Sequence, residues 1–134
     1  MSTPDFLTLE EVLALHARSL ELFGGGAGIR DRGLLESAVA APQSGFGGQY
    51  AHSSLFEMAA AYAFHIAQNQ PFVDGNKRAG LGSALLFLEL NGVELDDPQG
   101  QLYDAMIALA ERRMDKVALA KLLEQLASSA NAAE

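Results

Sequence analysis

The segment from Gln70 to Arg78 concentrates residue types that bind phosphate. Its sequence, Gln-Pro-Phe-Val-Asp-Gly-Asn-Lys-Arg, places Asp74 and Gly75 just before two adjacent cations, of which Lys77 is the first. If a helix begins here, its first amides have no acceptor within the helix and lie at the positive end of the helix dipole. The glycine lets the backbone approach a ligand, the cations face phosphate oxygens, and the aspartate can hold a bridging Mg²⁺ ion. The segment therefore predicts a phosphate-binding loop.

A solvated polar turn is the alternative interpretation of the same residues, and it stays open at this point. No histidine offers other chemistry nearby. His16 falls on the apolar face of the first expected helix, which predicts a packed, hydrogen-bonded side chain. His65 lies about 140° round a helix from Gln70, and His52 lies in a loop without a partner at a suitable spacing. The three lack the spacing of a metal site, and the chain has no cysteine.

The elements that must position this loop are helices, because apolar residues recur at helical spacing along nearly all of the chain. Capping residues, glycines and prolines mark where each helix begins and ends. The expected helices run from Thr8 to Gly24, from after Asp31 to before Pro42, from Ser54 to Asn69, from Asn76 to Asn91, from Asp97 through Leu109, and from Asp115 through Leu126.

The predicted fold class is all-α, a compact helical bundle with a buried central helix. The segment 76–91 is apolar on most sides, which predicts that it is the helix at the centre. Residues 42–52 have the composition of a loop, no strand pattern stands out, and residues 128–134 are expected to fray. A length of 134 residues suits a single domain over 1–134.

The charge balance limits the classes of partner. Nine Lys and Arg against 17 Asp and Glu give a formal charge of -8, which argues against a general nucleic-acid binder. The N-terminus lacks the basic start and apolar run of a signal peptide, and the most apolar stretch, 81–90, is far shorter than the roughly 20 residues that span a bilayer. We expect a cytoplasmic protein that binds neither nucleic acid directly nor a membrane.

The segment Pro71-Phe72-Val73-Asp74-Gly75-Asn76-Lys77-Arg78 resembles the signature of the Fic/Doc family, in the form of its death-on-curing (Doc) toxin branch. The family implies a compact all-α fold, a nucleoside triphosphate with Mg²⁺, and transfer of part of the nucleotide to a protein hydroxyl. By this resemblance Gln70, Asn76, Lys77 and Arg78 are the expected catalytic positions, with 74–78 binding the nucleotide and Asp74 the metal. Further landmarks, which extend the resemblance over residues 8–95, are Leu15-His16, Gly24-Gly25, Gly28-Ile29-Arg30-Asp31, Leu34-Leu35-Glu36-Ser37-Ala38, Phe87-Leu88 and Asn91-Gly92.

Two positions choose a branch within the family. The adenylylating branch usually has glycine between the motif's asparagine and arginine, and a second arginine three residues further on; here those positions are Lys77 and Leu81. This is the Doc pattern, which implies that ATP donates a phosphoryl group and that the substrate is the translation factor elongation factor Tu. AMP transfer is a weaker alternative. A catalytically silent binding module that keeps the groove for a partner is the main rival.

Gln70 departs from the family pattern. The resemblance places a histidine there, which serves as the general base for the attacking hydroxyl. A glutamine amide cannot accept that proton at pH 7, and loss of a general base typically costs about 10²–10⁴ in rate. The sequence is therefore either an inactivated version of the kind used to produce a toxin safely, which the intact remainder of the motif favours, or a natural member whose chemistry is lost or changed.

The resemblance also implies a partner. Doc-like toxins are restrained by a small Phd-like antitoxin whose flexible C-terminal segment orders itself on the toxin. Ser53 and Glu57 have the spacing of the family's inhibitory motif, but Met58 follows where that motif has Gly or Asn. We therefore expect inhibition by a separate chain rather than by an internal helix.

Overall fold

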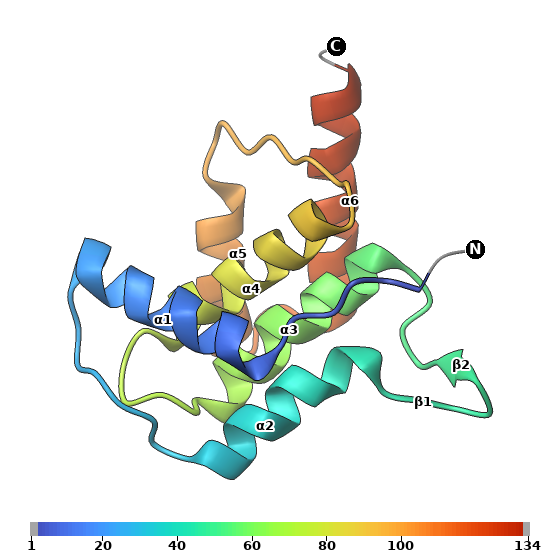
Figure 1. Cartoon of the computed structure of the whole chain (residues 1–134). Coiled ribbons are helices and arrows are strands. Elements are labelled where there is room, and N and C mark those ends of the chain that lie inside the picture. The colour runs from blue at the N-terminus through green and yellow to red at the C-terminus, as the bar shows by residue number, and fades with distance from the viewer. Residues whose placement is uncertain (1–2, 133–134) are drawn as a thin grey trace.

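The computed structural model describes residues 3–132, and six α-helices make up most of it (Figure 1). A short 3-10 turn and a hairpin of two-residue strands connect the second helix to the third. In chain order the elements are α1 (Leu9–Phe23), α2 (Arg32–Ala40), the 3-10 turn η1 (Ala41–Gln43), β1 (Gly45–Phe46), β2 (Gln49–Tyr50), α3 (Leu55–Asn69), α4 (Asn76–Leu90), α5 (Gln101–Ala110) and α6 (Lys116–Ala132).

The helix at the centre is α3, not the helix over 76–91 that the sequence analysis placed there. In Figure 1 α2 lies on one side of α3 and α4 on the other, and α5 and α6 also contact it. Every residue of 58–63 is buried, whereas the end of α4 is open, with Leu90 44% exposed. The alanines of α3 explain the difference, since they let neighbours come close: a Cβ on Gly80 of α4 would lie 3.0 Å from the Ala63 carbonyl oxygen.

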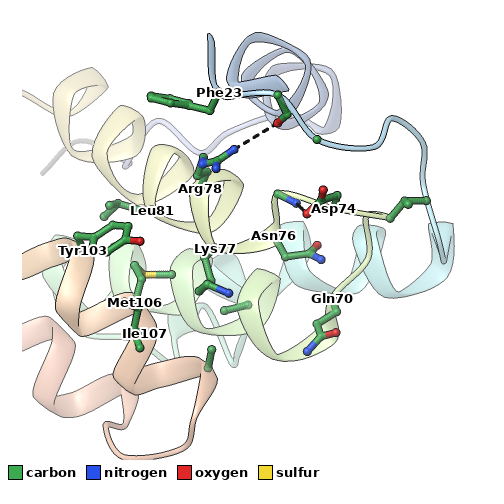
Figure 2. Close-up of a pocket in the computed structure, with 16 residues that line it drawn as sticks. Phe23, Gln70, Asp74, Asn76, Lys77, Arg78, Leu81, Tyr103, Met106 and Ile107 are labelled. Carbon is green, nitrogen blue, oxygen red and sulfur yellow. Dashed lines mark hydrogen bonds between the residues drawn. The ribbon is translucent and has the colours of Figure 1, made fainter. Parts of the chain in front are cut away.

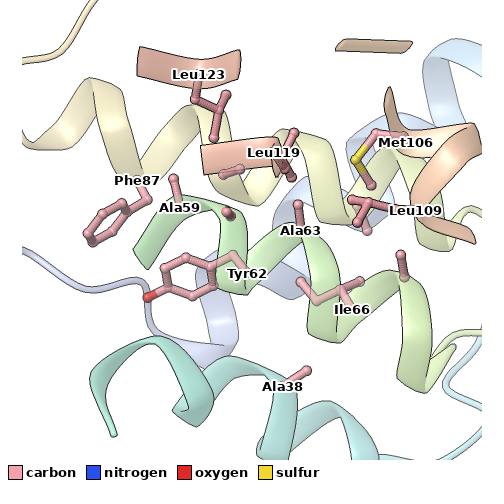
Figure 3. Packing of buried hydrophobic residues seen from close by; sticks show 14 of the residues in the cluster. Ala38, Ala59, Tyr62, Ala63, Ile66, Phe87, Met106, Leu109, Leu119 and Leu123 are labelled. Atoms are coloured by element: carbon pink, nitrogen blue, oxygen red, sulfur yellow. The ribbon is translucent and has the colours of Figure 1, made fainter. Parts of the chain in front are cut away.

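Larger side chains from the surrounding helices fill the space around these alanines (Figure 3). Tyr62 and Phe87 pack ring against ring at 5.3 Å between centroids, and both are fully buried. The Tyr62 hydroxyl accepts a hydrogen bond from the Leu7 amide at 2.9 Å, and burial raises the pKa of Tyr62 to about 12. Leu119 and Leu123 of α6 complete the core on the side of α3 that lies away from α2.

Side-chain caps fix most helix starts, as the sequence predicted. Thr8 and Glu11 form a capping box on α1, and Asp31 and Asp115 accept amide hydrogen bonds at the starts of α2 and α6. Ser54 likewise accepts the Glu57 amide on α3. A full capping box does not form on α3, because the Glu57 carboxylate accepts from the hydroxyl of Ser53 instead.

Three further sequence-based expectations are corrected. The predicted helix from Asp97 begins only at Gln101, because residues 97–100 form a turn in which the Asp97 carboxylate caps the Gln101 and Leu102 amides from outside. The segment 42–52, predicted as a loop, contains the β1–β2 hairpin; two-residue strands are too short to leave a period in sequence. The tail expected to fray from 128 instead continues α6 to Ala132, in keeping with its alanines, while 133–134 lie outside the described residues.

Across residues 3–132, no helix combines the length and apolar character needed to cross a membrane.

Candidate functional site

The predicted phosphate-binding loop connects α3 to α4 and is held in shape by its own residues. Gln70 ends α3 in the left-handed region, with φ 47° and ψ 56°, and Gly75 opens α4 with φ 77°. Between them the Asn76 side chain folds back: its Oδ1 accepts from the Phe72 amide at 3.0 Å and its Nδ2 donates to the Phe72 carbonyl at 3.1 Å. Asn76, predicted to act on the nucleotide, thus uses its side chain to close the loop and offers its backbone amide to a ligand.

The segment before α2 supports the loop from outside. The Val73 amide donates to the Gly28 carbonyl at 3.0 Å, and the Arg30 amide donates to the Pro71 carbonyl at 2.7 Å. These bonds form an isolated antiparallel bridge between Ile29 and Phe72. The segment that follows the glycines after α1 is therefore joined to the loop by backbone pairing.

His16 and Phe72 anchor the loop to the core. Their rings stack at 3.7 Å between centroids with an interplanar angle of 6°, and Phe72 is buried. His16 Nε2 donates to the Asp74 carbonyl at 2.7 Å. The prediction that His16 is a packed, hydrogen-bonded residue is confirmed.

The start of α4 differs from the other helix starts. Among the six α-helices of the described chain, α4 alone has no side-chain acceptor on its first-turn amides. The adjacent carboxylate, Asp74, turns instead toward Gly75 and Gly26. The backbone N–H groups of Asn76, Lys77 and Arg78 are left to a ligand, as an anion site requires.

The two cations diverge from this helix start. Arg78 points toward Phe23, where its guanidinium lies 4.9 Å from the ring centroid and Nη1 donates to the Gly24 carbonyl at 3.3 Å (Figure 2). Lys77 extends the other way and lies between Met106 and Gln70 in this view. No hydrogen-bond or ion-pair partner of its ammonium group occurs within the described part of the chain. Lys77 is thus free to meet an anion, while Arg78 is already oriented.

All of the predicted site residues line one pocket of about 610 Å³ (Figure 2). The sequence analysis did not predict the opposite wall, which is mainly apolar and comes from the end of α1, from Leu81 of α4 and from α5. The sequence held no local signal for this wall, because Phe23 and Tyr103 lie far apart in the chain and only the fold brings them to one pocket. The wall residues are Phe23, Leu81, Tyr103, Met106 and Ile107.

Gln70 lines the same pocket, and its side-chain amide has no hydrogen-bond partner among residues 3–128. Neither His52 nor His65 lines the pocket. His65 accepts instead from the ammonium of Lys116 at 3.3 Å, and burial, followed by that charge, lowers its pKa to about 4. Histidine therefore supplies no proton acceptor in the pocket.

Asp74 has the properties of a ligand for a magnesium ion carried by a nucleotide. Its Oδ2 accepts from the Gly26 amide at 3.1 Å and its Oδ1 from the Gly75 amide at 2.8 Å, and these bonds hold the pKa of the carboxyl below its usual range. The carboxylate is exposed, and each oxygen keeps a lone pair. Because Mg²⁺ in nucleotide sites is bound by one or two carboxylates together with substrate phosphates, Asp74 is the residue that could hold such an ion here.

Comparison with known proteins agrees with this geometry. The sequence matches the Fic/DOC family over residues 6–88. It is 39% identical to toxin Doc of Mycolicibacterium smegmatis over 128 residues, which are 94% of this chain and 96% of that protein. It is also 35% identical to protein kinase doc of Escherichia phage P1 over 121 residues, 90% of this chain and 94% of that protein. The resemblance expected from the motif is confirmed, and the chain belongs to the Fic/DOC family, in its Doc toxin branch.

Proposed function

We propose that this chain is a Doc-type toxin whose site is built to transfer a phosphoryl group from ATP to a hydroxyl of a protein substrate. The observation that carries the proposal is the uncapped start of α4, which borders the pocket beside Asp74, Lys77 and Arg78. Support also comes from the relatives, one of which is named a toxin and the other a protein kinase. The resemblance to Doc toxins makes elongation factor Tu the proposed substrate.

The pocket residues have separate roles in phosphate binding, metal binding and proton transfer. The first-turn amides of α4, Lys77 and Arg78 bind the phosphates, and Asp74 holds the nucleotide's Mg²⁺. When bound, that ion neutralises charge on the phosphate oxygens. The substrate oxygen forms a bond to the γ-phosphorus while the bond from that phosphorus to the bridging oxygen breaks, and ADP leaves. The hydroxyl proton goes to a base, for which the pocket position is residue 70.

Gln70 decides how much of this chemistry the chain performs. Its neutral amide can accept a hydrogen bond from the substrate hydroxyl but cannot take the proton at pH 7. We therefore propose that the chain binds nucleotide but transfers phosphate slowly or not at all. The same observation supports the second candidate, a silent module that uses the pocket only to bind a partner.

Replacing Gln70 tests the proposal. Histidine and asparagine both tolerate the left-handed backbone at this position, so Gln70→His adds a base without strain, and Gln70→Asn is the matched control without one. With ATP labelled at the γ- or the α-phosphate, we expect Gln70→His alone to label elongation factor Tu from the γ-position, about 10²–10⁴ faster than the unchanged chain. Label from the α-position would establish AMP transfer. A folded Gln70→His variant that transfers neither label would support the binding module and refute the kinase proposal.

A toxin of this kind requires an inhibitor, and we propose an antitoxin whose flexible, Phd-like C-terminal segment folds on this chain. Glu57, in the position of the family's inhibitory glutamate, is bonded to Ser53, and neither residue lines the pocket. These contacts support inhibition by a separate protein. Because the proposed substrate is a translation factor, we also propose that the protein acts in the cytoplasm. Calorimetry with the C-terminal peptide of the antitoxin should give a negative heat-capacity change and a weak salt dependence. Binding abolished by moderate salt would contradict packing as its basis.

A further inference from the structure

Arg30 contacts the end of α3 in a way that the proposed function does not use. Its Nη2 donates to the Asn69 carbonyl at 2.8 Å and its Nε to the Gln70 carbonyl at 2.7 Å. Its backbone amide donates to the next carbonyl, that of Pro71, also at 2.7 Å. One residue therefore holds three consecutive carbonyls, and the middle one belongs to the position where the reaction needs a base.

These carbonyls need outside donors. The last carbonyls of a helix have no partner within it and carry the negative end of its dipole, and a cation that donates to them compensates both. A planar guanidinium suits two neighbouring carbonyl oxygens, because its N–H groups form a fixed fork. Arg30 thus caps α3 from a segment 40 residues earlier in the chain.

The backbone at Gln70 explains why such a cap is required. A residue other than glycine rarely adopts φ 47° and ψ 56°, and it remains there only when the surroundings determine it. These two angles set where the side chain of residue 70 points and where the chain enters Pro71 and Phe72. Freed from its donors, the turn can relax and turn that side chain away from the pocket.

Arg30 also differs from other arginines on the surface. Arg18, Arg32 and Arg113 each pair with a glutamate one turn or less away. Within residues 3–132, Arg30 forms no such pair, and the carboxylate next to it, Asp31, is occupied by the Leu34 amide. Among the described residues, its guanidinium therefore donates only to the carbonyls at the end of α3.

We infer that Arg30 is a positioning residue that fixes the backbone of residue 70 and thereby aims its side chain into the pocket. The inference rests on the proposed function, since an aimed side chain matters only where a base or hydrogen-bond acceptor acts. The site then has two separate roles: the start of α4 binds the phosphates, and Arg30 orients the side chain of residue 70.

Two measurements test this role. In the unchanged chain, the ¹³Cα and ¹³Cβ chemical shifts of Gln70 report its backbone angles without any need for activity. We expect Arg30→Ala to move these shifts away from left-handed values, Arg30→Lys to retain part of the effect, and the matched control Arg32→Ala to change nothing. In the Gln70→His background, we expect Arg30→Ala to lower kcat at least tenfold while the Kd for Mg-ATP stays within twofold, with partial recovery in Arg30→Lys.

The outcomes separate the inference from the function it rests on. Unchanged Gln70 shifts in Arg30→Ala, or a kcat within twofold, would overturn the inference. Equal losses of kcat, nucleotide affinity and Tm, without recovery by lysine, would also overturn it, since they indicate a general structural role. An inactive Gln70→His parent would refute the proposed function alone, because the chemical shifts still decide the role of Arg30. If Arg30→Ala does not fold, Arg30→Lys decides by the same two measurements.

Discussion

Removing the ammonium group of Lys77 should weaken nucleotide binding without loosening the fold. Lys77 is exposed on the first turn of α4, and no described residue pairs with it, so Lys77→Ala removes only a contact to the ligand. A charge-assisted hydrogen bond to phosphate contributes about 1.5–3 kcal/mol. At 1.4 kcal/mol for each factor of ten, the Kd for Mg-ATP should rise roughly 10- to 150-fold. The Tm of the free protein should not change.

Arg78→Ala should give a different pair of results. It loses a phosphate contact of similar size, and it also loses the bond to the Gly24 carbonyl and the stacking over Phe23. At an exposed site a cation–π contact contributes about 0.5–1 kcal/mol, which lowers the Tm of a chain of this length by a few degrees.

Calorimetry with Mg-ATP and thermal unfolding of the free proteins test both variants. Arg18→Ala, which removes an exposed cation paired within α1, is the control for net charge. Equal affinity in the unchanged chain, Lys77→Ala and Arg78→Ala would place the nucleotide elsewhere and refute the assignment of the α4 start. A Tm loss in Lys77→Ala as large as that in Arg78→Ala would refute the distinction between a free and an oriented cation.

Two further predictions concern pH and the Asp74 carboxylate. Burial and the Lys116 ammonium hold the pKa of His65 near 4, so below pH 6.5 the unfolded chain binds a proton that the folded chain does not, and stability should fall from pH 6.5 towards 4. After allowance for solvent screening of this half-exposed ring, the free energy of unfolding measured in urea should fall by about 1 kcal/mol between pH 7 and pH 5. If the free energy of unfolding of His65→Gln falls equally over this range, His65 is not the cause. A Cβ on Gly25 would lie 2.9 Å from Asp74 Oδ2, at a backbone φ of +121°, so Gly25→Ala should displace the carboxylate and reduce the Mg²⁺ dependence of ATP binding. Gly26→Ala is the control, because its Cβ would make only ordinary van der Waals contacts, 3.4 Å from Val73 Cγ1 and 3.9 Å from Asp74 Cβ. Equal Mg²⁺ dependence in the two variants would count against Asp74 as the ligand.

Local chemistry made the helix starts and the loop predictable from sequence. Thr8, Asp31 and Asp115 act within three residues of themselves, so their caps could be predicted without knowing the fold. The loop was likewise predictable, because a glycine and two adjacent cations directly precede an apolar helical segment. Asp97 was predicted to begin a helix, but its carboxylate accepts the amides of Gln101 and Leu102 from outside the helix, and the local sequence does not distinguish the two arrangements.

Features that depend on tertiary contact were not predictable in this way. The choice of α3 as central helix follows from close approach of its alanines to Gly80, whereas the many leucines of α4 had suggested that α4 is the central helix. The apolar wall of the pocket needs α5 to fold against α4, and nothing local in Tyr103 or Met106 indicates that neighbour. The contacts of Arg30 join residues about 40 positions apart, beyond any local pattern.

The wide spread of the pocket along the chain has a consequence for the order in which activity appears during synthesis. The pocket lining begins at Phe23 of α1 and ends at Ala110 of α5. Contacts between such distant residues form late, because each requires closure of a long loop of chain. A chain still growing on the ribosome lacks the α5 wall until after residue 110 has emerged, however early the motif itself is made. A nascent toxin therefore has no assembled pocket for most of its synthesis, which leaves an inhibitor time to meet it as the site closes.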